Sequence, residues 1–242
     1  MLVRYVVVSA MTALAAAPAA SPPSSAATGR FAGEMEAFAA QDKAAPQPPC
    51  RIVFTGSSSI RFWTTLSQDM APMPVINRGF GGAQVSDVNA HFDEVVGRYR
   101  PRAVVFYAGE NDLNAGESKD SVAEDFGRFM KLKSEKLGAS TPVYYISLKP
   151  SRARERQIPD QNAVNAKIKA QMKGRKDFVY IDVVPQMMGA DGHPKDLFVA
   201  DGLHMNSAGY AIWTKAVRPV MEKEMKADRP ACRSAASASA KP

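Results

Sequence analysis

The feature that most constrains the fold is an alternation of short apolar runs with longer segments of helical periodicity. The runs are rich in Val, Ile, Phe and Tyr, which is typical of strands buried on both faces. They cover residues 51–55, 75–77, 103–107, 143–148 and 178–181. Repeated strand–helix units predict a parallel sheet with helices on both sides. We therefore expect an α/β protein, a three-layer α/β/α sandwich with a five-stranded parallel sheet.

The two ends of the chain differ from this core in composition. Residues 1–20 hold one charge, Arg4, before an apolar stretch with Ala-x-Ala patterns, which predicts a signal peptide and a secreted or periplasmic protein. A membrane anchor is the alternative interpretation. Residues 21–28 are rich in Pro, Ser and Ala and predict a flexible leader, and residues 233–242 predict a disordered tail. One folded domain is expected over residues 29–232.

The two cysteines, Cys50 and Cys232, lie at opposite ends of the predicted domain. In an oxidising compartment, a disulfide between them would fasten the C-terminal helix to the start of the first strand. Two free thiols are the alternative, because a sequence does not show whether two Cα atoms come within bridging distance. Two cysteines are too few for a disulfide scaffold or a four-cysteine zinc site.

The net charge is +7, from 31 Lys and Arg residues against 24 Asp and Glu residues. The basic residues are not interleaved with aromatic ones, so nucleic-acid binding is not indicated. No long uncharged apolar run follows the first 20 residues, so we expect no stable membrane insertion after signal cleavage. Four basic residues after the fourth strand favour a solvated loop, or alternatively a rim that attracts acidic substrates: Lys149, Arg152, Arg154 and Arg156.

Ligands of such sheets bind at the carboxyl ends of the strands, and polar residues follow the first strand directly. Gly56 is followed there by Ser57, Ser58 and Ser59. A serine at a strand-to-helix turn lies beside helix N–H groups that have no intrahelical partner. This placement suits a nucleophile whose product is an oxyanion. Helix capping or phosphate binding would explain the same residues.

The next two strands also end in polar or glycine-rich loops. Residues 77–82 (NRGFGG) let the backbone approach a ligand closely, or simply form a tight turn. Residues 109–112 (GEND) contain Asn111, whose side-chain NH₂ could donate to a substrate oxygen. A local Asn/Asp turn is the alternative for this second loop.

A histidine near the C-terminus completes the set of candidate groups. Asp201 precedes His204 by three residues and could accept the imidazole Nδ1–H, which leaves Nε2 as a base. Asn206 or Ser207 is placed to cap the last helix. His193 is a second candidate base but lacks this capping context, and we interpret His91 as a core or surface residue. A purely structural role is the alternative for Asp201 and His204.

The order and spacing of these groups resemble the SGNH (GDSL-like) hydrolase family over nearly all of the predicted core. Residues 201–210 (DGLHMNSAGY) carry the most specific part of the resemblance, and residues 109–112 the next. The resemblance implies a flavodoxin-like fold of the SGNH hydrolase type. It also implies a catalytic triad of Ser58, Asp201 and His204, and an oxyanion hole formed by Ser58, Gly82 and Asn111.

The sequence departs from the family pattern at two points. Ser57 stands where the family has Asp, so Ser57 and Ser59 remain alternative nucleophiles, and residues 81–83 (GGA) replace the common Ser-Gly-Asp. The resemblance implies a serine ester hydrolase that needs no metal or organic cofactor. We expect a small acyl-ester substrate, short-chain or acetyl, on a carbohydrate or lipid. The alternatives are a lysophospholipase or thioesterase with the same triad, or a non-catalytic carbohydrate- or lipid-binding module.

Overall fold

Each of the five predicted apolar runs forms a strand, because β-branched and aromatic side chains pack well on a pleated surface. The computed structural model describes residues 29–229 and 232; the predicted signal peptide, leader and tail lie outside the described residues. The strands are β1 (Ile52–Gly56), β2 (Val75–Gly79), β3 (Ala103–Tyr107), β4 (Val143–Ile146) and β5 (Phe178–Ile181). All pairs are parallel in the order β2-β1-β3-β4-β5, which confirms the predicted fold class.

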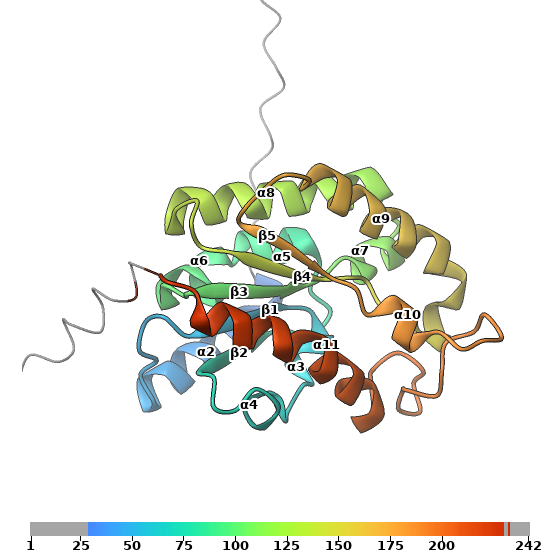
Figure 1. The fold of residues 1–242 in the computed structure, drawn as a ribbon, viewed down its shortest axis with the longest axis horizontal. Helices are drawn as coiled ribbons and strands as arrows, with labels where there is room; N and C mark the ends of the chain where they lie inside the picture. Colours follow the sequence, from blue (N-terminus) through green and yellow to red (C-terminus); the bar gives the residue numbers. More distant parts are fainter. Residues whose placement is uncertain (1–28, 230–231, 233–242) are drawn as a thin grey trace, which may run out of the picture.

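Helices connect the strands and surround the sheet (Figure 1). They are α2 (Ala32–Ala44), α3 (Ser58–Arg61), α4 (Leu66–Asp69), α5 (Val85–Ala90), α6 (Phe92–Val95), α7 (Glu110–Asn114), α8 (Lys119–Leu137), α9 (Ile158–Gln171), α10 (Val184–Met187) and α11 (Ser207–Lys226). Two 3₁₀ helices are η1 (Gly97–Tyr99) and η2 (Arg152–Gln157). Within the described part of the chain, no helix combines the length and the apolar character needed to cross a membrane.

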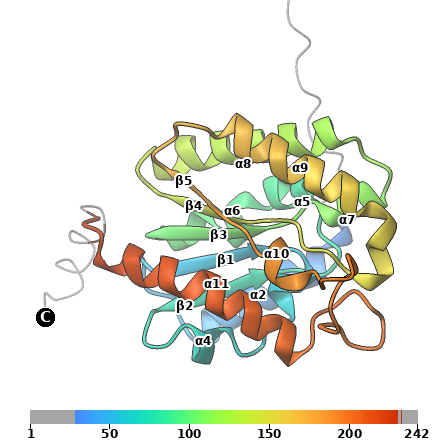
Figure 2. The ribbon, with the colours of Figure 1, turned by 45° about the vertical axis from the view of Figure 1, so that its right-hand side comes forward.

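The alternation of side chains along each strand divides the core between two helical layers, which Figure 2 shows from a second side. On one face, the Tyr145 ring contacts Phe126 of α8, with ring centroids 4.9 Å apart. On the other face, Tyr107 contacts Trp213 of α11 at 4.8 Å, and the Tyr144 hydroxyl donates to Glu224 of α11. Helix α8 and helix α11 therefore cover opposite faces of the sheet.

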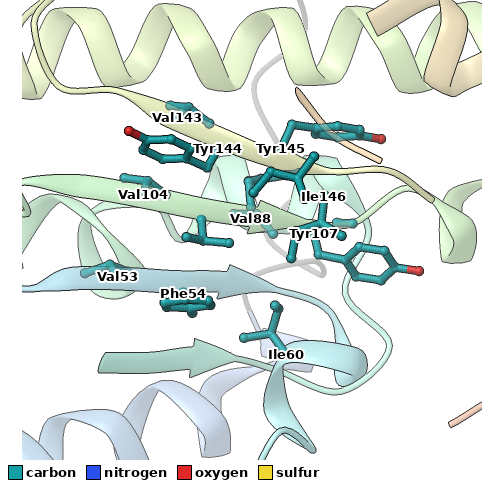
Figure 3. Packing of buried hydrophobic residues seen from close by; sticks show 14 of the residues in the cluster. Val53, Phe54, Ile60, Val88, Val104, Tyr107, Val143, Tyr144, Tyr145 and Ile146 are labelled. Carbon is teal, nitrogen blue, oxygen red and sulfur yellow. The ribbon is translucent and has the colours of Figure 1, made fainter. Parts of the chain in front are cut away.

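Burial on both faces explains why the strands read as continuous apolar runs rather than as alternating patterns. Figure 3 shows this packing: Val53, Val104, Val143 and Ile146 are completely buried between the layers. Removing a side chain of this kind from water contributes about 1.5–3 kcal/mol. The core is therefore continuous from β1 to β4, and it holds the ends of these strands in fixed positions.

The two ends of the domain pack against this core. Phe31, just before α2, meets the rings of Phe80 and His91 edge to face, so His91 is a buried core residue. Cys50 and Cys232 form a disulfide with their Cα atoms 5.5 Å apart. The disulfide therefore links Cys232, which follows α11, to Cys50, which precedes β1.

The strand order places the polar loops at one edge of the sheet. The chain runs from β1 outward to β2 and then crosses back to β3 on the other side of β1. The winding direction reverses there, and ligands of such sheets bind outside the carboxyl ends of the strands at this point, here those of β1 and β3. The loops after β1, β2 and β3 all open onto this position.

Candidate active site

A close backbone contact fixes the turn that carries Ser58. Gly56 has φ +130°, and a Cβ atom there would lie 1.8 Å from the carbonyl oxygen of Tyr107, so only glycine fits. The Ser57 amide donates to the same carbonyl oxygen at 2.8 Å. Ser58 is the first residue of α3 and stands at the carboxyl end of β1. The end of one strand and its neighbour thus determine where the Ser58 hydroxyl lies.

The three consecutive serines have different surroundings. The Ser58 Oγ lies 3.0 Å from Nε2 of His204. The hydroxyl oxygens of Ser57 and Ser59 are buried and have no hydrogen-bond partner among the described residues. The geometry therefore favours Ser58 over its two neighbours as a nucleophile.

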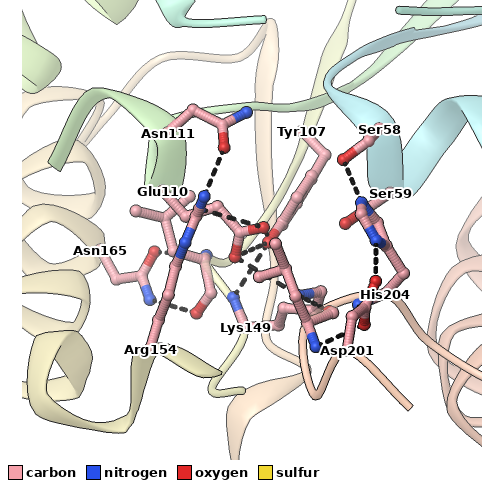
Figure 4. A network of polar contacts seen from close by, with 12 residues as sticks. Ser58, Ser59, Tyr107, Glu110, Asn111, Lys149, Arg154, Asn165, Asp201 and His204 are labelled. Carbon is pink, nitrogen blue, oxygen red and sulfur yellow. Dashed lines mark hydrogen bonds and ion pairs between the residues drawn. The ribbon is translucent and has the colours of Figure 1, made fainter. Parts of the chain in front are cut away.

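The loop that carries His204, residues 199–206, is called the His204 loop here, and it is organised around the Asp201 carboxylate. Its Oδ2 lies 2.6 Å from Nδ1 of His204, while its Oδ1 accepts the amides of Leu203 and His204 at 2.8 and 2.9 Å. Burial on its own raises the pKa of Asp201, but these hydrogen bonds outweigh it and lower the pKa to about 2. The carboxylate is ionised at neutral pH and can stabilise an imidazolium. Figure 4 shows Ser58, His204 and Asp201 in one hydrogen-bonded series.

The same loop is fastened at both of its ends. The Asn206 side chain accepts the Gly209 amide at 3.1 Å and caps α11, as predicted. The Val199 amide donates to the His204 carbonyl at 2.9 Å. The exposed ring of Phe62 meets the His204 ring edge to face, with centroids 4.8 Å apart.

The predicted oxyanion donors lie in the neighbouring loops. Gly82 has φ +74°, and the part of the chain that the structure describes offers no acceptor for its N–H or for that of Ser58. The Asn111 Nδ2 donates to the Ala83 carbonyl at 3.0 Å, and its Oδ1 accepts from Arg154 at 2.8 Å. An amide nitrogen carries two hydrogens, so the second remains for a substrate oxygen. These groups have the chemistry that an oxyanion hole requires.

The interpretation of the basic residues after the fourth strand as a solvated loop is wrong for two of the four. The side chain of Lys149 is completely buried and that of Arg154 is 11% exposed, whereas Arg152 and Arg156 are exposed. The reason is Glu110, a buried carboxylate that requires cationic partners. Glu110 begins α7 just after the buried strand β3, and that position is the signal in the sequence that points to a buried carboxylate.

The remaining candidate groups lie elsewhere. His193 is exposed and pairs with Glu155, and this hydrogen bond raises the pKa of its imidazole. Apart from Ser58, His204 and Asp201, a cluster of three carboxylates lies among the described residues. The carboxylates of Asp112, Glu117 and Asp125 each offer an oxygen within 4.8 Å of the others, a spacing that could hold a metal ion. Asp125 is already paired with Arg128.

A serine hydroxyl, an imidazole and a carboxylate in series, beside unpaired N–H groups, form the arrangement used by serine hydrolases. Comparison with known proteins gives the family. The profile of the GDSL-like lipase/acylhydrolase family matches residues 47–212, which include every residue of this site. The chain belongs to this family, and it is a carboxylic ester hydrolase.

Three relatives illustrate the likeness. Platelet-activating factor acetylhydrolase IB subunit alpha1 of Homo sapiens is 23% identical over 190 residues, which are 74% of this chain and 78% of that protein. A GDSL-like lipase from Bacteroides thetaiotaomicron has a TM-score of 0.67 and 23% identity over 78% of this chain and 97% of that one. A variant of an acetyl-xylooligosaccharide esterase from Geobacillus has a TM-score of 0.56 and 14% identity, covering 75% and 96%. The structural matches establish a shared fold.

Proposed function

We propose that this ester hydrolase is a secreted serine esterase that removes short acyl groups, acetyl above all, from carbohydrate or lipid esters. The observation that carries the proposal is the series from Ser58 Oγ to His204 Nε2, at 3.0 Å, and from His204 Nδ1 to Asp201, at 2.6 Å. These are hydrogen-bond distances suited to proton transfer from a nucleophile to a base.

The geometry supports a two-step acyl transfer. His204 takes the Ser58 proton as Oγ attacks the ester carbonyl carbon, and Asp201 stabilises the imidazolium. The tetrahedral oxyanion accepts hydrogen bonds from the N–H groups of Ser58 and Gly82 and from Nδ2 of Asn111. The imidazolium then protonates the leaving alcohol as its C–O bond breaks, which leaves an acyl-serine.

Water completes the cycle. His204 takes a proton from a water molecule, whose oxygen attacks the acyl carbon, and the carboxylic acid leaves as Ser58 regains its proton. Each proton that His204 accepts is returned within the same half-reaction. The cycle therefore uses only the ester and water.

Two observations support a short acyl group. The names of two relatives, an acetylhydrolase and an acetyl-xylooligosaccharide esterase, both specify acetyl release. In addition, the two exposed large apolar side chains of the described residues, Phe62 and Val199, lie at the His204 loop. They offer a small apolar surface next to His204.

Two observations support secretion. Residues 1–20 have the composition of a signal peptide. The disulfide between Cys50 and Cys232 is of the kind that persists in oxidising compartments. Fractionation of the native host tests this, and recovery of the full-length reduced chain in the cytoplasm would contradict it.

Hydrolysis of p-nitrophenyl esters from acetate to laurate, and of acetylated xylo-oligosaccharides, tests the activity. We expect fastest turnover of acetyl esters, and Ser58→Ala should lower kcat by about 10⁴–10⁶. Ser57→Ala is the matched control and should retain most of the activity. Turnover that survives Ser58→Ala would overturn the mechanism. A preference for long chains would favour a lysophospholipase, and the absence of any turnover would favour a binding module.

A further inference from the structure

Behind the site lies a buried group of charged side chains that the mechanism above does not use. We propose that Glu110, Lys149 and Arg154 form a positioning network that orients Asn111 toward the oxyanion and fixes the loop of His204. The inference rests on the proposed function, because it assigns a purpose only if Asn111 and His204 act in catalysis. Figure 4 shows the network between these two residues.

The network is centred on the Glu110 carboxylate, which is 2% exposed. The Tyr107 hydroxyl donates to Glu110 at 2.8 Å, the Lys149 ammonium lies 3.4 Å away, and the Arg154 guanidinium lies 3.8 Å away. Burial lowers the pKa of Lys149, and the neighbouring Glu110 charge opposes that effect. Glu110 thus places two cations between the two halves of the site.

A buried ion pair is weak grounds for a role in stability, since desolvation of both charges offsets most of their attraction. An apolar group of the same volume would serve packing at least as well. What an apolar group cannot do is donate hydrogen bonds at fixed positions on both sides. Lys149 and Arg154 each donate such a hydrogen bond, Lys149 to the His204 loop and Arg154 to Asn111.

The first contact of the network, made by Lys149, holds the His204 loop. Lys149 Nζ donates to the carbonyl oxygen of Leu203 at 3.0 Å. That carbonyl belongs to the peptide whose N–H, on His204, donates to Asp201 at 2.9 Å. The peptide that carries the base is therefore held from both sides, by Lys149 and by Asp201.

The second contact of the network, made by Arg154, determines which way the Asn111 amide faces. Arg154 donates to Oδ1 of Asn111 at 2.8 Å, while Nδ2 donates to the carbonyl of Ala83 at 3.0 Å. A flipped amide would place NH₂ against the guanidinium and Oδ1 against a carbonyl oxygen, so two hydrogen bonds would become two repulsions. Arg154 thereby keeps the donor nitrogen on the side of Ser58, as Figure 4 shows. Arg154 is a positioning residue that acts through Asn111.

A double-mutant cycle between Arg154 and Asn111 tests this relation. Asn111→Ala should lower kcat by about 10²–10³, the usual loss for one oxyanion donor. Arg154→Met should lower kcat by about 10- to 100-fold through misorientation of that donor, with KM changed less than about threefold. In the Asn111→Ala background, Arg154→Met should cost little more, because a purely structural defect would add to the first loss whereas a loss through Asn111 would not.

Controls separate positioning from folding. Arg152→Met removes a half-exposed cation from the same segment and should leave kcat unchanged. If Arg154→Met unfolds, Arg154→Lys keeps a single donor for Asn111 and should retain part of the activity. Lys149→Met removes the contact to the Leu203 carbonyl and leaves Arg154 as the cation beside Glu110. It should lower kcat additively with Asn111→Ala, because Lys149 acts on His204 and not on Asn111.

The outcomes distinguish this inference from the proposed function. Equal losses from Arg154→Met in both backgrounds, or a loss confined to KM, would overturn the positioning role while Ser58→Ala still abolishes activity. Full activity of Ser58→Ala would instead overturn the proposed function, and with it the inference. Wild-type kcat in Arg154→Met with a Ser58-dependent enzyme would reject the network alone.

Discussion

The turn that carries Ser58 and the loop that carries His204 are built in different ways. Ser58 is placed by backbone: Gly56 passes within contact of the Tyr107 carbonyl, and no side chain intervenes. His204 is placed by side chains, with Asp201 holding its ring and Lys149 its peptide. The position of Ser58, the proposed nucleophile, therefore depends on the sheet, whereas that of His204, the proposed base, depends on side-chain hydrogen bonds that substitutions can remove. Changes in the backbone turn that places Ser58 should therefore damage folding, whereas changes in the side chains that hold His204 should damage catalysis first.

Asp201→Asn should have the largest effect, and it should act mainly on catalysis. With its oxygen held by the Leu203 and His204 amides, Asn would turn its NH₂ toward Nδ1 and could not accept the Nδ1 hydrogen that leaves Nε2 free as a base. The kcat should therefore fall by about 10⁴, the loss that the same change causes in a serine protease. The Asn Oδ1 still accepts the Leu203 and His204 amides, so the melting temperature should fall only slightly, by the part of the stability that the carboxylate charge supplies. Steady-state kinetics and thermal unfolding measure both quantities. A kcat within tenfold of wild type would show that the Asp201 carboxylate is not needed to make His204 a base.

Gly56→Ala tests the other side and should act on folding. The new Cβ would lie 1.8 Å from the Tyr107 oxygen at a backbone φ of +130°. The free energy of unfolding should fall by more than about 3 kcal/mol, since overpacking and φ strain add. Gly116→Ala is the matched control, because its φ is +92° with open space around it. It should cost only about 1 kcal/mol. Equal losses in urea unfolding would show that the close contact at Gly56 is unimportant.

The His204 loop and α7, which carries Asn111, also differ in their response to pH. The lowered pKa of Asp201 contributes stability that is present above its unfolded pKa and is lost as pH falls toward about 2. Burial raises the pKa of Asp112, next to Asn111, to about 7, so ionisation of Asp112 costs stability as pH rises through that value. Asp112→Asn should therefore gain about 2 kcal/mol relative to wild type between about pH 5 and pH 8. Urea unfolding at both pH values measures it, and a pH-independent difference would contradict the assignment.

Asn206→Ala should have the smallest effect and should touch both stability and catalysis. The loss of the α11 cap should cost about 1 kcal/mol, and the loosened loop should lower kcat a few-fold. Ser118→Ala removes the corresponding cap of α8, far from the triad in sequence, and should cost similar stability with kcat unchanged. If both variants lower kcat equally, the cap of α11 does not help to hold His204.

The sequence predicted the strands because their signal is local. Runs of apolar residues end at the same places in the structure to within two residues, and Gly56 with the serines that follow it indicated a turn that carries a hydroxyl at the end of the first strand. The spacing of Asp201 and His204 is local too, since three residues are enough for a carboxylate to reach back to an imidazole. Each of these features follows from residues that are neighbours along the chain.

Burial of charge was not predictable in the same way. Lys149 and Arg154 follow a strand and resemble ordinary loop residues, and only the packing of Glu110 beneath them makes them internal. The choice among three serines was equally open, because the residue that distinguishes them, His204, lies 146 positions away. Contacts between residues so far apart in the chain produce no local pattern in the sequence from which they could be predicted.

By itself, the sequence determined a parallel sheet flanked by helices and the residue types that collect at its carboxyl edge. This follows because hydrophobic periodicity and turn chemistry act between residues a few positions apart. The tertiary structure alone decided which hydroxyl meets the imidazole, which way Asn111 faces, and which basic residues lie inside. Those outcomes depend on long-range packing and desolvation, whose energies are set only when distant segments come together.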